Sequence, residues 1–202
     1  MRLYTSPATP FGRKVMALIL ELGLQDRIEI IHVMGTPLAP GSLPVDQNPL
    51  GKIPALQTDD GAIYDSRVIC RYLNDLVGGA MYPTGAAIWP CLVREAAVDG
   101  ILEAALAMAY EVRLRPVDKQ FPEWIEAQWA KAARALDVIE AEWAAILAGP
   151  VEMPLIGLAC ALGYIDFRLD ARNWRAERPK LAAWEAEFAK RPAMLATRPV
   201  QV

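Results

Sequence analysis

The sequence has little of what a metal site or a nucleophilic catalytic pair requires. His32 is its single histidine, and the three cysteines, Cys70, Cys91 and Cys160, lack the spacing of metal ligands. One histidine nearly excludes Ser-His and Cys-His pairs. We therefore expect no metal site and inert, mostly buried cysteines. Any chemistry has to rely on hydroxyls, on backbone groups or on a nucleophile that another molecule brings.

The chain also lacks a strong excess of charge and a long apolar run. Its 21 lysines and arginines against 24 aspartates and glutamates give a net charge of −3, whereas nucleic-acid-binding proteins usually carry a basic stripe. No apolar run approaches the ~20 residues of a membrane span. Ser6, Pro7 and Pro10 interrupt the order of a signal peptide. We expect a cytoplasmic protein with neither a nucleic-acid partner nor a membrane partner.

The first part of the chain alternates strand and helix patterns. Gly23 stands where a helix commonly ends, and Asp59-Asp60-Gly61 has the composition of a hairpin turn. The expected strands are 2–5, 28–33, 55–58 and 62–64. The expected helices are 10–22 and 66–77.

From about residue 88 onward the strand patterns disappear. Prolines and a Gly149-Pro150 pair punctuate a stretch that is rich in alanine, glutamate, leucine and arginine. The expected helices are 88–113, 122–148, 155–170 and 179–190. We predict an α/β domain over residues 1–78, a linker near Met81–Gly85 and an all-α domain over residues 86–202.

The segment NPLGKIPAL, residues 48–56, contains a proline at the entry to an expected strand. A trans proline at Pro54 costs a ladder hydrogen bond, and a cis Ile53-Pro54 bond avoids this by turning the chain. The backbone N–H and C=O of Ile53 then point outward and can pair with an extended peptide. A strand-entry proline without any ligand is the simpler alternative.

The segment YDSRVICRYL, residues 64–73, places Asp65 and Ser66 where a strand gives way to a helix. A hydroxyl and free N–H groups at a helix N-terminus can bind a carboxylate. An aspartate beside them suits a ligand that also carries an ammonium group, such as the α-amino acid end of a peptide. A plain helix cap is the alternative. Together the two segments describe a site for γ-glutamyl-cysteinyl-glycine.

At this point the chain resembles the soluble bacterial glutathione S-transferases over essentially its whole length. The segments that carry the resemblance are 4–15, 48–56, Asp65-Ser66, and 159–168 with Trp174 and Arg178-Pro179. The resemblance implies a thioredoxin-like α/β N-terminal domain, an all-helical C-terminal domain and a homodimer. It implies a detoxification enzyme that conjugates the glutathione thiolate to small apolar electrophiles, without a metal.

The resemblance also implies roles for individual residues. Ile53 pairs through its backbone with the cysteinyl part of glutathione, beside cis-Pro54, while Asp65 and Ser66 hold the γ-glutamyl end. Lys52 or the loop 35–41 meets the glycine carboxylate. Two alternatives to the transferase share the fold: a non-catalytic interaction protein of the transcription-associated type, and a glutathione-dependent carrier of apolar ligands.

The turn TSPATP, residues 5–10, lies where the resemblance places the glutathione sulfur. Thr9 is expected to cap the first helix, with Pro10 as the first helical residue. Its hydroxyl is also the preferred donor to the thiolate, and Ser6 is the alternative donor. Threonine departs from the serine or cysteine that is common in the family here. The tryptophans and tyrosines of the helical half are expected to belong mainly to its core, and Tyr110 and Trp174 are the ones to test as walls of the electrophile pocket.

Overall fold

The computed structural model describes residues 1–201, which form two compact units. The first unit comprises residues 1–83 together with the chain end from Pro192, and the second comprises Thr84–Arg191. No helix within residues 1–201 is both long enough and apolar enough to cross a membrane.

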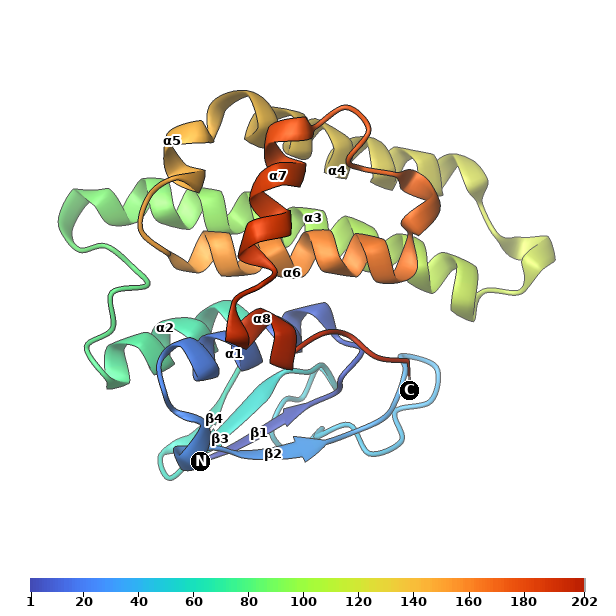
Figure 1. Cartoon of the computed structure of the whole chain (residues 1–202). Helices are drawn as coiled ribbons and strands as arrows, with labels where there is room; N and C mark the ends of the chain where they lie inside the picture. Colours follow the sequence, from blue (N-terminus) through green and yellow to red (C-terminus); the bar gives the residue numbers. More distant parts are fainter. Residues whose placement is uncertain (202) are drawn as a thin grey trace. The chain divides into compact units, whose positions relative to one another are not determined.

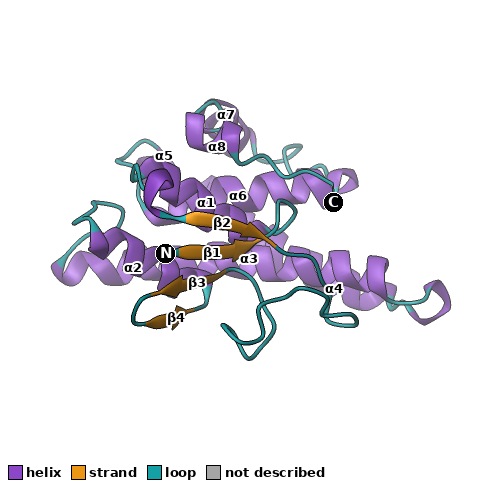
Figure 2. Ribbon diagram, turned by 90° about the horizontal axis from the view of Figure 1, so that it is seen from below, coloured by secondary structure: helices purple, strands orange, loops and turns teal. Residues whose placement is uncertain are grey.

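The first unit is built on a four-stranded sheet. Its strands are β1 (Arg2–Thr5), β2 (Glu29–His32), β3 (Ala55–Thr58) and β4 (Gly61–Ile63). They lie in the order β2-β1-β3-β4, which Figure 2 shows along the sheet. Strand β1 is parallel to β2 and antiparallel to β3, and β3 is antiparallel to β4. Each strand lies within two residues of its expected range.

Helices cover one face of this sheet. They are α1 (Pro10–Glu21) and α2 (Ser66–Leu76), which Figure 1 shows side by side on the same face. A short 3₁₀ turn, η1 (Gln25–Arg27), precedes β2. The order β-α-β followed by β-β-α is the thioredoxin-like arrangement, and the predicted fold class of this unit is confirmed.

The chain end differs from the expected division, which assigned it to the all-α domain. Residues Pro192–Ala196 form a short helix, α8, that packs against α1 in the first unit. Ala193 and Met194 are buried, and the Arg13 guanidinium donates a hydrogen bond of 3.3 Å to the Met194 carbonyl. The contact with α1, rather than any local sequence pattern, therefore places this segment.

The second unit is all helical, as predicted. Its α-helices are α3 (Ile88–Leu114), α4 (Pro122–Glu142), α5 (Ala144–Leu147), α6 (Met153–Arg168) and α7 (Pro179–Phe188). Short 3₁₀ turns are η2 (Gly85–Ala87), η3 (Val117–Lys119) and η4 (Asp170–Arg172). Helix α3 packs against both α4 and α6. The expected helix 122–148 is divided at Trp143 into α4 and α5.

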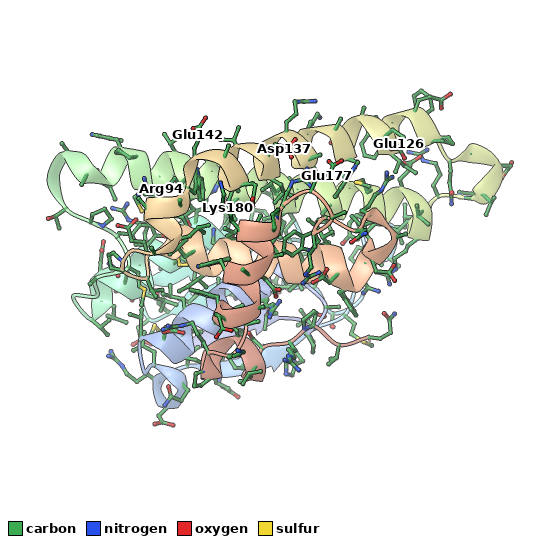
Figure 3. All side chains as sticks on the ribbon, turned by 45° about the horizontal axis from the view of Figure 1, so that its top comes forward. Arg94, Glu126, Asp137, Glu142, Glu177 and Lys180 are labelled. Atoms are coloured by element: carbon green, nitrogen blue, oxygen red, sulfur yellow. The ribbon has the colours of Figure 1, made fainter. Side chains whose placement is uncertain are left out.

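Helix α6 begins without a side-chain cap. Glu152 occupies the cap position, and its carboxylate accepts a hydrogen bond of 3.0 Å from Arg94 on α3 instead of one from its own helix. Arg94 is labelled in Figure 3. Glu152 thus links α6 to α3 through Arg94 instead of capping its own helix.

Arg178 holds the start of α7 to its neighbours. Its guanidinium, only 5% exposed, donates to the carbonyls of Trp174 at 3.0 Å and Ala133 at 3.3 Å. It also donates to the Asp137 carboxylate on α4 at 2.5 Å, and Figure 3 labels this aspartate. Both backbone acceptors lose their side-chain partner if the arginine is removed.

We expect Arg178→Ala to lower the free energy of unfolding by about 2–4 kcal/mol, because it leaves buried acceptors and a carboxylate without a partner. Urea unfolding followed by circular dichroism measures this. Arg134→Ala on α4 is the matched control, since Arg134 is exposed and makes no hydrogen bond or ion pair within residues 1–201. The control should stay within about 0.5 kcal/mol of the unsubstituted chain. Equal stability of the two variants would contradict this role of Arg178.

Candidate active site

The strand register brings three separate connections of the first unit together at one end of the sheet, where β1 and β4 finish and β3 begins. Tyr4 pairs with Ala55, and Leu56 pairs with Ile63, both in antiparallel ladders. The chain leaving β1, the chain entering β3 and the chain leaving β4 therefore meet at the same end of the sheet. The residues predicted to bind or activate glutathione, apart from the loop 35–41, lie in these three connections or, for Ser66, at the first residue of α2.

The connection after β1 leads directly into α1. Thr9 is the residue before the helix, Pro10 is its first residue, and the Thr9 N–H donates to the Ser6 carbonyl at 3.1 Å. These boundaries are the expected ones, but the Thr9 side chain makes no capping hydrogen bond. Thr9 and Ser6 are both partly exposed. The Thr9 hydroxyl is therefore not engaged by the helix that it precedes.

A close approach between α1 and the end of β1 fixes the Thr9 side chain. A Cβ atom at Gly12 would overlap the Thr5 hydroxyl and the Thr9 methyl group. Only glycine fits between these two threonines, and the Thr9 methyl group therefore faces the helix. Thr5 is 2% exposed, and its hydroxyl has no hydrogen-bond partner within residues 1–201. Neither Gly12 nor Thr5 had been assigned a role from the sequence, because this contact is tertiary.

The connection into β3 carries the predicted cis peptide bond between Ile53 and Pro54. Within the described part of the chain, neither the N–H nor the C=O of Ile53 makes a hydrogen bond. Asn48, 2% exposed, holds this connection: its side-chain amide donates to the Lys52 carbonyl at 2.9 Å and accepts from the Leu50 N–H at 3.1 Å. The backbone of Ile53 is thus held in place while its own polar groups stay unpaired.

Sequence reasoning missed the role of Asn48, although the residue opens the segment that had been singled out. The signal was local: an asparagine before Pro-Leu-Gly commonly bonds the backbone two residues ahead. Lys52 itself is exposed, so its ammonium group lies on the surface of this connection.

The connection after β4 ends at the N-terminus of α2. Asp65 is the N-cap, and its carboxylate accepts from the Arg67 N–H at 3.0 Å and from the Arg67 guanidinium at 3.1 Å. Ser66 is the first helical residue and is 3% exposed. Its hydroxyl makes no hydrogen bond with any residue between 1 and 201. Asp65 therefore caps the helix, whereas the Ser66 hydroxyl remains available to a ligand.

The surroundings of Asp65 favour its ionised form. Burial alone would raise the pKa of its carboxyl group, but the hydrogen bond and charge of Arg67, with the N–H groups of Arg67 and Val68, lower the pKa below its usual value. The stabilisation that this carboxylate gives is present above its unfolded pKa and is lost as the pH falls through the lowered folded pKa. The site therefore combines an anionic carboxylate with the hydroxyl donor of Ser66 beside it.

The two aromatic residues considered for an electrophile pocket differ in the structure. Trp174 is 1% exposed, and its indole N–H donates to Asp166 at 2.9 Å, so the residue belongs to the core of the helical unit. This burial agrees with the expected core role of Trp174 and leaves it little surface for a pocket wall. Tyr110, on α3, is partly exposed.

A metal site was not expected from the sequence. Among residues 1–201 no three histidine, cysteine, aspartate or glutamate side chains gather in a way that could hold a metal ion. The three cysteines are buried and form no disulfide within residues 1–201, and burial raises the pKa of Cys91 to about 12.

Known proteins match this chain over nearly its whole length. The family model described as glutathione S-transferase, N-terminal domain, matches residues 8–76. The uncharacterised GST-like protein YibF of Escherichia coli strain K12 is 33% identical over 205 residues, which cover 98% of each chain.

Solved structures agree with this match. A glutathione transferase family member from Pseudomonas fluorescens Pf-5, crystallised with bound glutathione, is 44% identical, with a TM-score of 0.95 over 99% of each chain. A structure of a Pf-5 family member with bound S-(propanoic acid)-glutathione is 43% identical, with a TM-score of 0.92 over 100% of each chain. The match to these proteins in sequence and in backbone therefore extends over nearly the whole chain. The chain belongs to the glutathione S-transferase family.

Proposed function

We propose that the chain is a glutathione transferase that binds glutathione at this end of the sheet in its first unit and joins the sulfur to a small, largely apolar electrophile. One observation carries the proposal: Ile53 has a backbone N–H and C=O without partners, in a connection that Asn48 holds in place. A peptide ligand can add to such a segment as an extra strand.

Each part of glutathione has a chemical counterpart at this end of the sheet. The cysteinyl backbone pairs with Ile53 beside Pro54, and the γ-glutamyl carboxylate accepts hydrogen bonds from the hydroxyl and backbone N–H of Ser66 at the N-terminus of α2. The γ-glutamyl ammonium group pairs with the ionised Asp65. Lys52 is the positively charged side chain of this connection, and it pairs with the glycine carboxylate.

The sulfur is activated by lowering its pKa, not by a second side chain that removes its proton. Thr9 donates its hydroxyl hydrogen to the thiolate, and the N-terminus of α1 adds its dipole. A hydrogen bond to a charged group contributes roughly 1.5–3 kcal/mol, and one pKa unit corresponds to about 1.4 kcal/mol. The two effects bring a thiol from about 8.5 to about 6.5–7, so that much of it is ionised at neutral pH.

The reaction then follows from proximity and from the ionised sulfur. The thiolate electron pair forms a carbon–sulfur bond, and a leaving group departs with its electrons or a conjugated acceptor takes them up and is protonated. The relatives support this chemistry. One Pf-5 structure contains glutathione, and another contains glutathione whose sulfur carries a propanoic acid group.

Calorimetric titration with glutathione, followed by turnover with a panel of electrophiles, tests the proposal. We expect binding and turnover together. Binding without turnover of any electrophile would indicate a ligand carrier. The absence of glutathione binding would favour a non-catalytic interaction protein.

Ser66→Ala should weaken glutathione binding by about 1–3 kcal/mol, the range for loss of one partner in a polar contact. Calorimetry measures the affinity. The free energy of unfolding should stay within about 0.5 kcal/mol, because the hydroxyl makes no hydrogen bond to the protein. Unchanged affinity in this folded variant would remove Ser66 from the site.

Thr9→Ala should raise the pKa of bound glutathione by about one to two units, because the thiolate loses a hydrogen bond of roughly 1.5–3 kcal/mol. Ultraviolet absorbance of the thiolate, followed against pH with glutathione bound, measures this. The stability of the variant should change by less than the ~1 kcal/mol of an ordinary helix cap, because Thr9 makes no capping bond.

Two control variants identify the donor. Thr9→Ser keeps the hydroxyl and frees its rotation, so the pKa should stay low. Ser6→Ala should leave it unchanged. A raised pKa in Ser6→Ala together with a normal pKa in Thr9→Ala would show that Ser6 is the donor. If neither variant changes the pKa, the N–H groups of α1 alone hold the thiolate.

We also propose a homodimer that forms through the groove between α3 and α4. This groove has a volume of about 420 Å³ and is lined mainly by alanine and glycine, including Ala97, Gly100 and Ala104. Gln128 and Lys131 of α4 supply polar groups at its side. Small residues let a second helix approach closely, as a self-complementary interface requires.

Light scattering at micromolar concentration should give twice the chain mass of 22.2 kDa. Gly100→Arg should shift the protein to the monomer, because the long charged side chain would fill the groove that the second copy needs. The single chain itself should tolerate the change, because a Cβ at this position meets no atom within 4 Å. Gly100→Ala is the control and should remain a dimer. A clean monomer before any substitution would contradict the proposal.

A further inference from the structure

Arg13, near the start of α1, is a buried arginine that no carboxylate neutralises. The residue is 9% exposed, and the one hydrogen bond of its guanidinium within residues 1–201 goes to the Met194 carbonyl, at 3.3 Å. Its Nε and Nη1 are buried and bond to no residue that the structure describes. Buried charges are normally paired, because an unpaired one costs stability. Arg13 therefore holds a positive charge that the fold itself does not use fully.

The charged residues around Arg13 do not compensate it. Helix α8, which packs over this part of α1, contains no charged residue. On the sheet, Arg2 and Glu29 pair with each other at 3.0 Å. The other charged residues of α1 and of its neighbour α2 are Lys14, Glu21, Arg67, Arg71 and Asp75. Neither carboxylate of this set is bonded to Arg13 in the described part of the chain.

Arg13 lies one helix turn from Thr9, the residue proposed to donate to the sulfur. The Arg13 N–H donates to the Thr9 carbonyl at 3.0 Å, which closes the first turn of α1. Residues four apart share one face of a helix, with Cβ atoms about 5–6 Å apart, and helical side chains tilt toward the N-terminus. Arg13 therefore leaves α1 on the same face as Thr9 and on the side nearer the turn 5–10.

We propose that Arg13 stabilises the negative charge of the glutathione sulfur from behind Thr9, as a fixed charge that does not itself touch the ligand. Attraction between charges strengthens where water is excluded, and α8 excludes water from this guanidinium. A buried charge at such a distance lowers the pKa of a neighbouring acid by on the order of one unit. The proposal rests on the transferase function proposed above, and it adds to the effects of the Thr9 hydroxyl and the α1 N-terminus.

Two variants that remove the charge test the proposal. Arg13→Met keeps an apolar stem, and Arg13→Gln keeps an N–H donor for the Met194 carbonyl. Both should raise the pKa of the bound glutathione thiol by about one unit, measured by ultraviolet absorbance of the thiolate against pH. Arg13→Lys keeps the charge and should raise that pKa less than either neutral variant. An unchanged pKa in the folded neutral variants would overturn the proposal.

Met194→Ala separates the charge of Arg13 from the packing of α8. Met194 is 2% exposed, so its truncation should loosen α8 and lower the midpoint of urea unfolding. The neutral Arg13 variants should lower this midpoint as well, because they weaken the same contact. Met194→Ala leaves the positive charge in place, so the thiol pKa should stay low. A rise equal to that in Arg13→Met would show that Arg13 acts only through α8, and it would overturn the proposal.

A ligand without an ionisable thiol gives a second measurement. S-methylglutathione has the same peptide backbone as glutathione, and calorimetry should find equal affinity for it in Arg13→Met and in the unsubstituted chain. Near neutral pH the variant should bind glutathione up to tenfold more weakly, because a pKa shift of one unit corresponds to a factor of ten. An equal loss of affinity for both ligands would overturn the proposal, because Arg13 would then shape the site without acting on the sulfur.

These measurements distinguish this proposal from the proposed function. If the unsubstituted chain binds neither ligand, the transferase is contradicted and the role of Arg13 with it. If it binds both and the neutral variants keep a low thiol pKa, only the role of Arg13 is contradicted.

The unsubstituted chain keeps the proposal testable even if neither neutral variant folds. The pKa of its bound thiol should change little between low and high salt, because salt screens a buried charge poorly. A rise at high salt to the pKa of free glutathione would overturn the proposal, because an exposed charge would then be responsible.

Discussion

The antiparallel pairing of β1 with β3, and of β3 with β4, is the constraint on which the site depends. Because Tyr4 pairs with Ala55 and Leu56 with Ile63, three turns that are far apart in the sequence share one end of the sheet. A slip of one residue in either ladder would turn every side chain of a strand to the other face. It would also move Ile53 away from the two helix N-termini. The buried Leu3 and Leu56, both fully inaccessible, pair across the first ladder and resist such a slip.

Within this frame, the protein leaves polar groups unpaired where a ligand can use them. Helix N-termini normally have their free N–H groups bonded by a side chain. At α1 the Thr9 side chain makes no such bond, and at α2 the Asp65 carboxylate caps while the adjacent Ser66 hydroxyl remains unbonded. Unmet polar groups cost stability in the free protein. They also keep donors ready in position, so a bound peptide forms hydrogen bonds without first breaking those of the protein.

The sequence was sufficient where backbone geometry is encoded locally. Pro54, Gly61 and Pro10 each restrict or permit particular backbone angles, and the predicted strand entry, hairpin and helix start agree with the structure. The sequence failed where position depends on a partner distant in the chain. Helix α8 has only five residues, and its placement depends on Arg13 and on packing against α1. The sequence left the choice between core and pocket wall open at Trp174 for the same reason, since its burial and its bond to Asp166 follow from how the helices pack.

This contrast separates the two kinds of specificity that a transferase needs. In the proposed transferase, recognition of glutathione uses mostly backbone atoms and short side chains of the first unit. Their positions follow from strand register and proline geometry, so this recognition can persist while most side chains change. Recognition of the second substrate in such an enzyme depends on side chains that project from helix surfaces, and these can be exchanged without altering the fold. A family can therefore keep one glutathione site and change the molecule that receives the sulfur, because the two tasks draw on different parts of the chain.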